Sequence, residues 1–210
     1  MAARSREALK AIAHGVALVV VTPALVSFWV RSWILGRDRS LEHSTQALAL
    51  VPGLYGQYMR RAFLRCTLAY CDPSALIEFG TIFSSAGARI DAHVYVGPYC
   101  AIGLVHIEHD VMIAPAVQIP SGRLTHGISD PTTPMRDQPG MPQLVRIGAG
   151  TWIGGAAVVM ADVGANTIVG AGAVVTKPVP DGVVAGGVPA RVLYNRDEPA
   201  TSSPREPSTP

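Results

Sequence analysis

This 210-residue sequence has little charge, few aromatic residues and only three cysteines. Charged residues make up 15% of the chain and aromatic residues 6%, and the 17 Lys and Arg nearly balance the 15 Asp and Glu. Because no long basic run and no alternation of aromatic and basic residues occurs, a nucleic-acid groove is not expected. Cys66, Cys71 and Cys100 are odd in number and lack the spacing of metal ligands. Cys100 falls at a small inward position of a repeat and is expected to be a reduced packing residue, and a reducing, cytoplasmic environment fits best.

A six-residue repeat dominates the later part of the chain, from Ile147 to Val179. Neither a helix of 3.6 residues per turn nor a two-residue strand alternation gives this period; it is typical of a parallel β-helix. An aliphatic residue is expected to point inward, with a small residue four places later and Gly supplying freedom for the bends. The blocks begin at Ile147, Ile153, Val159, Val163, Val169 and Val175, and the small residues are Thr151, Ala157, Thr167 and Ala173.

The same repeat occurs earlier, with Val94, Cys100, Val111 and Val117 in the small inward positions and block starts at Ile90, Val96, Ile102, Ile107, Ile113 and Ile119. Six blocks on each side of an interruption make four coils of three sides, and less regular turns from Ile77 leave room for another. Coils stacked ~4.8 Å apart would bury a continuous aliphatic column. We therefore predict a mainly β protein whose β-helix domain spans residues 71–194.

The repeat fails between Ile119 and Leu144, in a stretch rich in Pro and Gly. An irregular excursion longer than ~12–15 residues in a compact domain is usually functional or disordered. Residues 120–143 are expected to project from one face as an arm, and we place the chemistry there because the arm holds a polar cluster: His126, Asp130, Arg136 and Asp137. Residues 195–210 have nothing to bury and are expected to be a disordered tail.

The first 70 residues are apolar and helical in character. Residues 11–30 carry no formal charge and would reach ~30 Å as a helix, the thickness of a bilayer core. Basic residues on both sides leave the orientation open, and Pro23 allows a kinked or re-entrant helix. Residues 41–68 indicate an amphipathic region broken at Pro52-Gly53. Membrane association is predicted; a cleaved signal peptide and a helix that covers the end of the β-helix remain alternatives.

Three stretches resemble the hexapeptide-repeat acyltransferases, and in particular their branch of sugar and polysaccharide O-acetyltransferases: Thr125–Arg136, Thr151–Val159 and Val169–Val192. The most specific of them is the last, with its Gly-rich turns, Thr-Lys pair and Gly-x-Pro-Ala-Arg ending. The resemblance implies a left-handed β-helix, against the usual right-handed rule for parallel crossovers. It also implies a homotrimer that uses acetyl-CoA.

In that family, a His on the projecting arm, followed by an Asp-Pro pair and an Arg, is the catalytic base, and His126, Asp130 and Arg136 match. The sequence departs from the pattern by having Gly127 where Pro is common and a wider spacing to Arg136. The chemistry also requires a base, because a sugar hydroxyl must lose its proton as it attacks a thioester, and imidazole titrates in the right range. Asp130 is expected to orient the imidazole or to bind the acceptor, and the alternative is that it only forms an Asp-Pro turn. Arg136 is expected either to contact the acceptor or to form a salt bridge within the loop.

The resemblance further implies a cofactor groove between neighbouring prisms. Trp152 is expected to form one wall of this groove; packing between the subunits of the trimer is its alternative role. For Lys177, the alternative is a solvated position on the surface. A Lys and an Arg suit the phosphates of CoA. Direct transfer is expected, because the arm contains no cysteine, and backbone N–H groups near Gly154 could stabilise the oxyanion. The residues that match cofactor positions are Trp152, Gly155, Ala171, Thr176, Lys177 and Arg191.

The favoured function is transfer of an acetyl group to a hydroxyl of a sugar, glycan or lipid-linked saccharide, at the cytoplasmic face of a membrane. An alternative acceptor is a small soluble molecule such as serine, an amino-sugar or an antibiotic. The same fold also hosts zinc-dependent hydratases, but His106 and His109 have no third histidine at a matching spacing, so no metal is expected. A non-catalytic trimeric scaffold is a further alternative and would need neither His126 nor Lys177.

Overall fold

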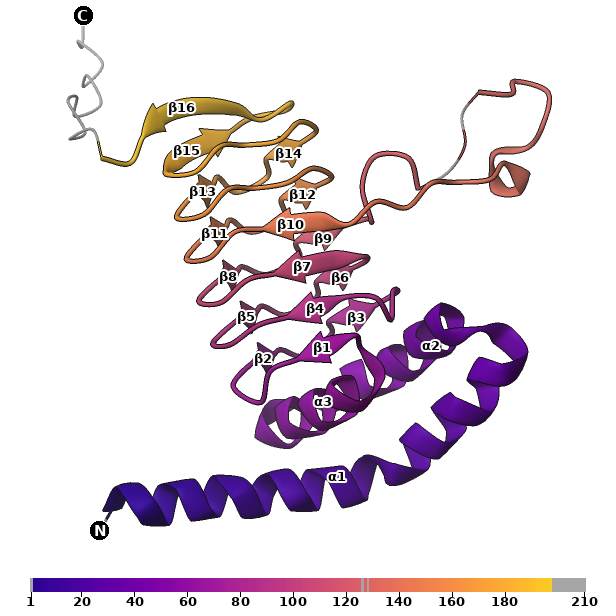
Figure 1. The fold of residues 1–210 in the computed structure, drawn as a ribbon, viewed down its shortest axis with the longest axis vertical. Helices are drawn as coiled ribbons and strands as arrows, with labels where there is room; N and C mark the ends of the chain where they lie inside the picture. Colours follow the sequence, from indigo (N-terminus) through magenta and orange to yellow (C-terminus); the bar gives the residue numbers. More distant parts are fainter. Residues whose placement is uncertain (1, 126, 128, 198–210) are drawn as a thin grey trace, which may run out of the picture.

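The structure is a computed structural model that describes residues 2–125, 127 and 129–197 (Figure 1). Three helices precede a stack of short strands. The helices are α1 (Ala2–Leu35), α2 (Arg37–Ala49) and α3 (Gly53–Thr67), and a 3₁₀ turn, η1 (Met135–Asp137), lies in the arm. The chain therefore begins helical and turns to β structure at residue 70.

The strands form three parallel sheets that are the three sides of a left-handed β-helix. Sheet A holds β1 (Tyr70–Cys71), β4 (Arg89–Ile90), β7 (Val105–Ile107) and β10 (Val145–Ile147). Sheet B holds β2 (Leu76–Ile77), β5 (Tyr95–Val96), β8 (Met112–Ile113), β11 (Trp152–Ile153), β13 (Ile168–Val169), β15 (Val183–Gly186) and the antiparallel β16 (Arg191–Asn195). Sheet C holds β3 (Ile82–Phe83), β6 (Ala101–Ile102), β9 (Gln118–Ile119), β12 (Val158–Val159) and β14 (Val174–Val175). Single bridges from Ile147 to Val163 and on to Val179 continue sheet A.

The predicted inward positions are confirmed. Every block start from Ile90 onward is at most 2% exposed, and all the small positions, including Cys100, are at most 1% exposed. The stack is longer than the four coils expected, because the five strands of sheet C mark five full coils and β15 begins a sixth. The first coil is hard to recognise in the sequence because Cys71 and Phe83 occupy positions that later coils fill with Val or Ile.

The glycines that follow the block starts have a different role from the one expected. The left-handed corner residues, with φ near +60°, are mostly not glycine; they include His93, Tyr99 and Ala116. Gly148 and Gly154 are instead points of close approach, where an added Cβ would lie 2.4 Å from the backbone N of Ala165 and 2.5 Å from that of Ala171. These glycines are therefore needed so that successive coils can stack, rather than for backbone freedom.

Helices α2 and α3 cover the first coil (Figure 1). Their side chains satisfy backbone groups that an open end would leave without partners. Arg60 donates from Nε to the carbonyl of Ile77 at 3.0 Å, and Arg61 donates to that of Ala75 at 3.2 Å. The Thr45 hydroxyl both donates to and accepts from the backbone of Phe83. The break between the two helices falls at residues 50–52, beside the Pro52-Gly53 pair.

Helix α1 runs along the outer side of α2 and α3 and continues through Pro23 (Figure 1). Ala17, Val21 and Phe28 are buried against the other helices. The apolar stretch Ile12–Leu35 is 24 residues long with a mean hydropathy of 1.9, which is long and apolar enough to cross a membrane, and 17% of it is buried.

Candidate functional site

The arm leaves the solenoid between β9 of sheet C and β10 of sheet A, and its root is firmly held (Figure 1). The backbone N–H of Gln143 donates to the carbonyl of Ser121 at 2.8 Å, and that of Met141 donates to Leu124 at 2.7 Å. The Thr125 hydroxyl donates to the carbonyl of Pro120 at 2.5 Å. His126 itself lies outside the described residues, but it directly follows this fixed segment.

A groove of about 540 Å³ lies on the C-terminal side of the arm root; we call it the C-terminal groove. It brings Thr176 and Lys177 together with Arg123 at the start of the arm. In the described part of the chain, neither Lys177 nor Arg123 has a hydrogen bond or ion pair, so both cations are available to a ligand. The lining residues are Arg123, Gln143, Leu144, Val145, Met160, Ala161, Asp162, Thr176, Lys177 and Pro178.

A smaller hollow of about 280 Å³ lies on the N-terminal side of the arm root; we call it the N-terminal hollow. Glu42 of α2 faces Gln118 and Thr125 across it. The Glu42 carboxylate makes no hydrogen bond or ion pair with any described residue, although the residue is partly buried. The lining residues are Glu42, Ile82, Ser84, Ala101, Ile102, Gly103, Gln118, Ile119, Pro120, Ser121 and Thr125. Residues 123–125 thus pass between the two spaces, just before His126.

Asp130 forms a turn within the arm. Its carboxylate accepts hydrogen bonds from the Thr132 hydroxyl at 2.7 Å, the Thr132 N–H at 2.8 Å and the Thr133 hydroxyl at 2.6 Å. These bonds, from Thr132 first, lower the pKa of Asp130 to about 2. Gln138 closes the same turn by donating to the carbonyl of Asp130 at 2.6 Å. Arg136 is largely exposed, and its Nε lies 3.5 Å from the Asp137 carboxylate, so it forms an ion pair within the arm. Asp130 thus forms a turn and Arg136 a loop salt bridge, as the alternatives to acceptor binding had it.

The other predicted cofactor residues lie at the opposite edge of sheet C. Gly155 and Ala171 follow sheet B strands in successive coils, and the Gly172 N–H donates to the carbonyl of Gly155 at 2.8 Å. Arg191 begins β16 next to that edge, since the Ala190 N–H donates to the carbonyl of Val174 at 2.8 Å. Trp152 points outward from β11 and is 44% exposed. One chain therefore does not gather all the predicted cofactor residues in one groove.

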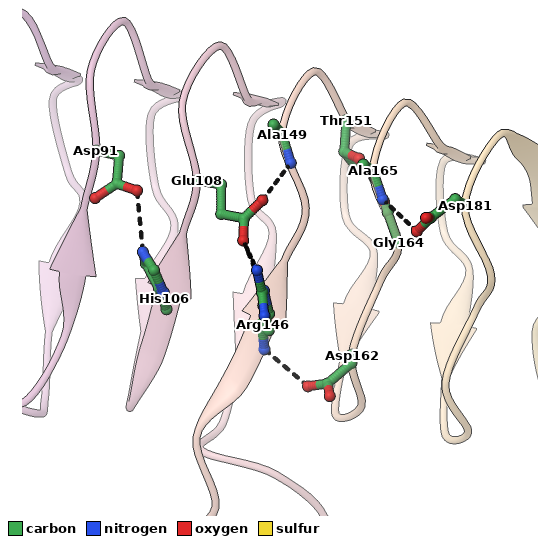
Figure 2. Close-up of polar contacts among 10 residues, drawn as sticks. All are labelled: Asp91, His106, Glu108, Arg146, Ala149, Thr151, Asp162, Gly164, Ala165 and Asp181. Atoms are coloured by element: carbon green, nitrogen blue, oxygen red, sulfur yellow. Dashed lines mark hydrogen bonds and ion pairs between the residues drawn. The ribbon is translucent and has the colours of Figure 1, made fainter.

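A ladder of polar contacts runs along sheet A and the corner beyond it (Figure 2). Asp91 lies 3.0 Å from Nε2 of His106, and Glu108 accepts from Arg146 Nε at 2.6 Å and from the Ala149 N–H at 2.9 Å. Partial burial alone would raise the pKa of Glu108, but the hydrogen bonds from Arg146 and Ala149 outweigh it and lower that pKa. Asp162 accepts from the backbone of Arg146 at 2.8 Å. These side chains bind one another from coil to coil and belong to the wall of the solenoid.

No three His, Cys, Asp or Glu side chains gather as a metal site in residues 2–125, 127 and 129–197. His106 pairs with Asp91, whereas His109 pairs with Asp110, which raises the pKa of His109. Burial raises the pKa of Cys71 to about 12 and also raises that of Cys100. Neither of these thiols is suited to carry an acyl group, because the thiolate is the nucleophile.

Arg123 and Glu42 were not among the residues singled out in the sequence. Arg123 approaches Lys177 only because residues 121–124 pair with residues 141–143, a pairing that no six-residue repeat predicts. Glu42 reaches the hollow only because α2 packs on the first coil. In the sequence, only the position of Arg123 three residues before His126 could have indicated that it lies at the site. No feature of the sequence indicated this for Glu42.

No protein-family profile matches this chain. It is 40% identical over 143 residues to Nodulation protein L of Rhizobium meliloti (strain 1021), a match that covers 62% of this chain and 72% of that protein. Its fold is similar to that of a maltose O-acetyltransferase from Clostridium difficile 630, with a TM-score of 0.64 and 23% identity over 77% of this chain and 89% of that one. A hexapeptide-repeat acetyltransferase from Vibrio cholerae O1 biovar eltor, crystallised with acetyl-CoA, gives a TM-score of 0.60 and 20% identity over 79% and 92% of the two chains. From its repeat, its arm and its identity to Nodulation protein L, the chain belongs to the hexapeptide-repeat acetyltransferases.

Proposed function

We propose that the protein transfers the acetyl group of acetyl-CoA directly to a hydroxyl of a sugar, glycan or lipid-linked saccharide. The observation that carries the proposal is the arm root, which lies between two spaces of different character. The C-terminal groove offers two cations and the N-terminal hollow offers a carboxylate, none of which pairs with another of the described residues. Donor and acceptor can then meet at residue 126. The acetyltransferase structures with the same fold, one of them described as a maltose O-acetyltransferase, support this choice.

His126 is the general base in this proposal. The thioester is already activated, so the reaction needs a group that accepts the hydroxyl proton as the oxygen attacks. A new ester bond forms, the thioester bond breaks, and CoA leaves as the thiol or thiolate. The hydrogen bonds of Thr125 to Pro120 and of Met141 to Leu124 hold the backbone of the arm root directly before residue 126.

The donor occupies the C-terminal groove, where Lys177 and Arg123 bind phosphate groups and Thr176 lines the wall. A cation and a phosphate form a charge-assisted hydrogen bond, and both cations are exposed to a ligand in this groove. Backbone N–H groups near Gly154 and Gly155 remain candidates for stabilising the oxyanion. The N-terminal hollow takes the acceptor, and Glu42 and Gln118 bind its hydroxyl groups. Asp130 and Arg136 then act mainly by shaping the arm.

We further propose that a second copy of the chain completes the donor site, in a homotrimer. Trp152, Gly155, Ala171 and Arg191 are separated from the C-terminal groove by sheet C, and an adjacent copy could present them to it. The outward side of sheet B supports such packing, because its strands align an apolar row that includes Met112 (47% exposed) and Trp152 (44% exposed). The row, one residue per strand, is Leu76, Tyr95, Met112, Trp152 and Ile168.

We also propose that residues 1–70 associate with a membrane and that the solenoid faces the cytoplasm, where acetyl-CoA is available. The long apolar stretch of α1 supports the association. Membrane association would keep the enzyme close to saccharides that are carried on lipids. A small soluble acceptor is the competing possibility.

An acceptor screen with radiolabelled acetyl-CoA tests the proposal, using saccharides, lipid-linked saccharides, serine and amino-sugars. An alkali-labile product on a saccharide is expected, because an ester hydrolyses in alkali whereas an amide does not. His126→Ala should lower turnover by about 10²–10⁴-fold with little change in CoA affinity. The matched control is His109→Ala, which lies at the other edge of sheet A from the arm and should retain full turnover. Full activity of His126→Ala, or an alkali-stable product alone, would contradict the proposal.

A further inference from the structure

Helix α1 has an apolar side that no described part of the chain covers. The residues on this side lie mostly three, four or seven positions apart and are more than half exposed: Ile12, Val16, Val19, Val20, Val26, Val30, Trp33 and Ile34. Val19 is 73% exposed and Trp33 is 91% exposed. A core helix of the same composition would be mostly buried, whereas only 17% of this apolar stretch is. Its side chains are suited to an apolar environment outside the protein.

The opposite side of α1 is fixed to the other two helices between His14 and Arg31. Arg61 lies 3.3 Å from Nε2 of His14, and the Arg31 guanidinium donates to the Ser44 hydroxyl at 2.7 Å. Between them, the ring centroids of Phe28 and Phe63 are 5.8 Å apart. Since α2 and α3 are in turn bonded to the first coil, α1 lies across the base of the solenoid and does not project from it (Figure 1).

This docking argues against a helix that crosses the bilayer. If α1 crossed it, the attached α2 would have to enter the hydrocarbon with it, carrying the exposed Asp38, Arg39 and His43. Charged side chains at that depth are costly. A helix that lies in the plane of the membrane immerses only its uncovered side, to a depth of ~5–10 Å.

The surroundings of α1 fit an anionic lipid surface. Residues 1–39 hold six basic side chains and two acidic ones, and the basic ones flank the uncharged residues 11–30 on both sides rather than on one. A crossing helix usually has its basic residues on one side, whereas a helix lying at the headgroups benefits from them at both ends. An apolar groove of about 460 Å³ joins Ile12, Val16 and Val20 to Leu54 and Tyr55 of α3, which extends the apolar surface across the base.

We propose that α1 is a monotopic helix that lies in one leaflet of the bilayer, with both its ends on the side of the solenoid. This inference rests on the membrane association proposed above and specifies its geometry. The coils then stack away from the membrane. Two helical layers and three coils place the arm root roughly 25 Å from the lipid surface. The acceptor hydroxyl must lie at that height, which suits a saccharide extending from a lipid.

Cysteine labelling in oriented membrane vesicles tests the geometry. In a Cys66→Ser background, which removes the exposed thiol and leaves the buried Cys71 and Cys100, Ser5→Cys reports the start of α1 and Gln46→Cys reports the solenoid side. A membrane-impermeant maleimide should label both from the same side. Labelling from opposite sides, or a chain that is absent from the membrane fraction, overturns the proposal. Acetyl transfer by the same purified variants is measured separately, so that loss of the enzymatic function is distinguished from failure of this geometry.

Vesicle binding tests the surface itself. With mixed phosphatidylcholine and phosphatidylglycerol vesicles, Val19→Glu should weaken binding by about tenfold or more, because it puts a charge in the immersed side. Gln46→Glu adds the same charge at an exposed position on α2 and should leave binding nearly unchanged. Equal binding of Val19→Glu and the unaltered protein would overturn the proposal.

Discussion

The wall of the solenoid and the arm that leaves it are held by different forces. In the wall, block starts such as Ile90 and Ile153 are fully buried and repeat from coil to coil. In the arm, polar bonds around Asp130 and Gln138 maintain the turn, and most side chains are exposed. Stability is therefore concentrated in the wall and the proposed chemistry in and beside the arm. Substitutions in the two regions should affect different measurements.

The largest expected loss of stability comes from the wall. Ile90→Ala removes a side chain with 0% exposure and leaves a cavity between coils, so the free energy of unfolding should fall by about 2–5 kcal/mol. Chemical denaturation measures this. The matched control is the neighbouring Arg89→Ala, which points outward from the same strand and should cost less than about 1 kcal/mol. Equal losses for the two variants would contradict the assigned register.

The next largest loss of stability is expected at the end of the stack that α2 and α3 cover. Arg60→Met removes the donor to the carbonyls of Ile77, Leu48 and Val51, so the free energy of unfolding should fall by about 2 kcal/mol. Burial lowers the pKa of Arg60, so part of the gain from its bonds is already offset by desolvation. Arg65→Met, at an exposed position of the same helix, is the control in the same denaturation experiment. If both variants unfold alike, the cap does not depend on these bonds.

The groove beside the arm should show the opposite pattern, with kinetics altered and stability retained. Lys177→Ala and Arg123→Ala should each raise KM for acetyl-CoA about tenfold, or ~1.4 kcal/mol, since each removes a partner for phosphate. The difference should shrink at high salt because charges in an open groove are screened. Steady-state kinetics at two ionic strengths measure this, with Arg89→Ala as the control. Unchanged KM values in both variants would contradict the proposal that acetyl-CoA binds in the C-terminal groove.

The smallest effect is expected inside the arm. The pKa of Asp130 is lowered to about 2, so the stabilisation from its ionised form is present above its unfolded value of about 3.9 and is lost only as pH falls through about 2. Asp130→Asn should therefore lower turnover only about threefold and leave the pH midpoint of activity unchanged, because imidazole titrates near pH 6–7. A shift of that midpoint in a pH–rate profile would make Asp130 a direct partner of the base.

The repeat makes the wall readable from the sequence, because each inward position is set by a local six-residue period. The first coil was predicted only as less regular turns from Ile77, because Cys71 and Phe83 do not look like members of that repeat. The glycines after the block starts were recognised in the sequence. They are required because the next coil approaches their Cα atoms closely, which is a contact between residues distant in the sequence. Arg123 and Glu42 depend on how the arm root and α2 pack, and Gly155 and Thr176 lie at different edges of sheet C. Tertiary packing of that kind leaves no period in the sequence.

A structure of the protein with acetyl-CoA bound would show whether donor and base meet beside the arm. The account predicts that the phosphates lie beside Lys177 and Arg123 and that the thioester lies within hydrogen-bonding reach of the residue 126 imidazole, in a crevice shared by two chains. Acetyl-CoA bound away from the Thr176-Lys177 edge, with residue 126 far from the thioester, would contradict it.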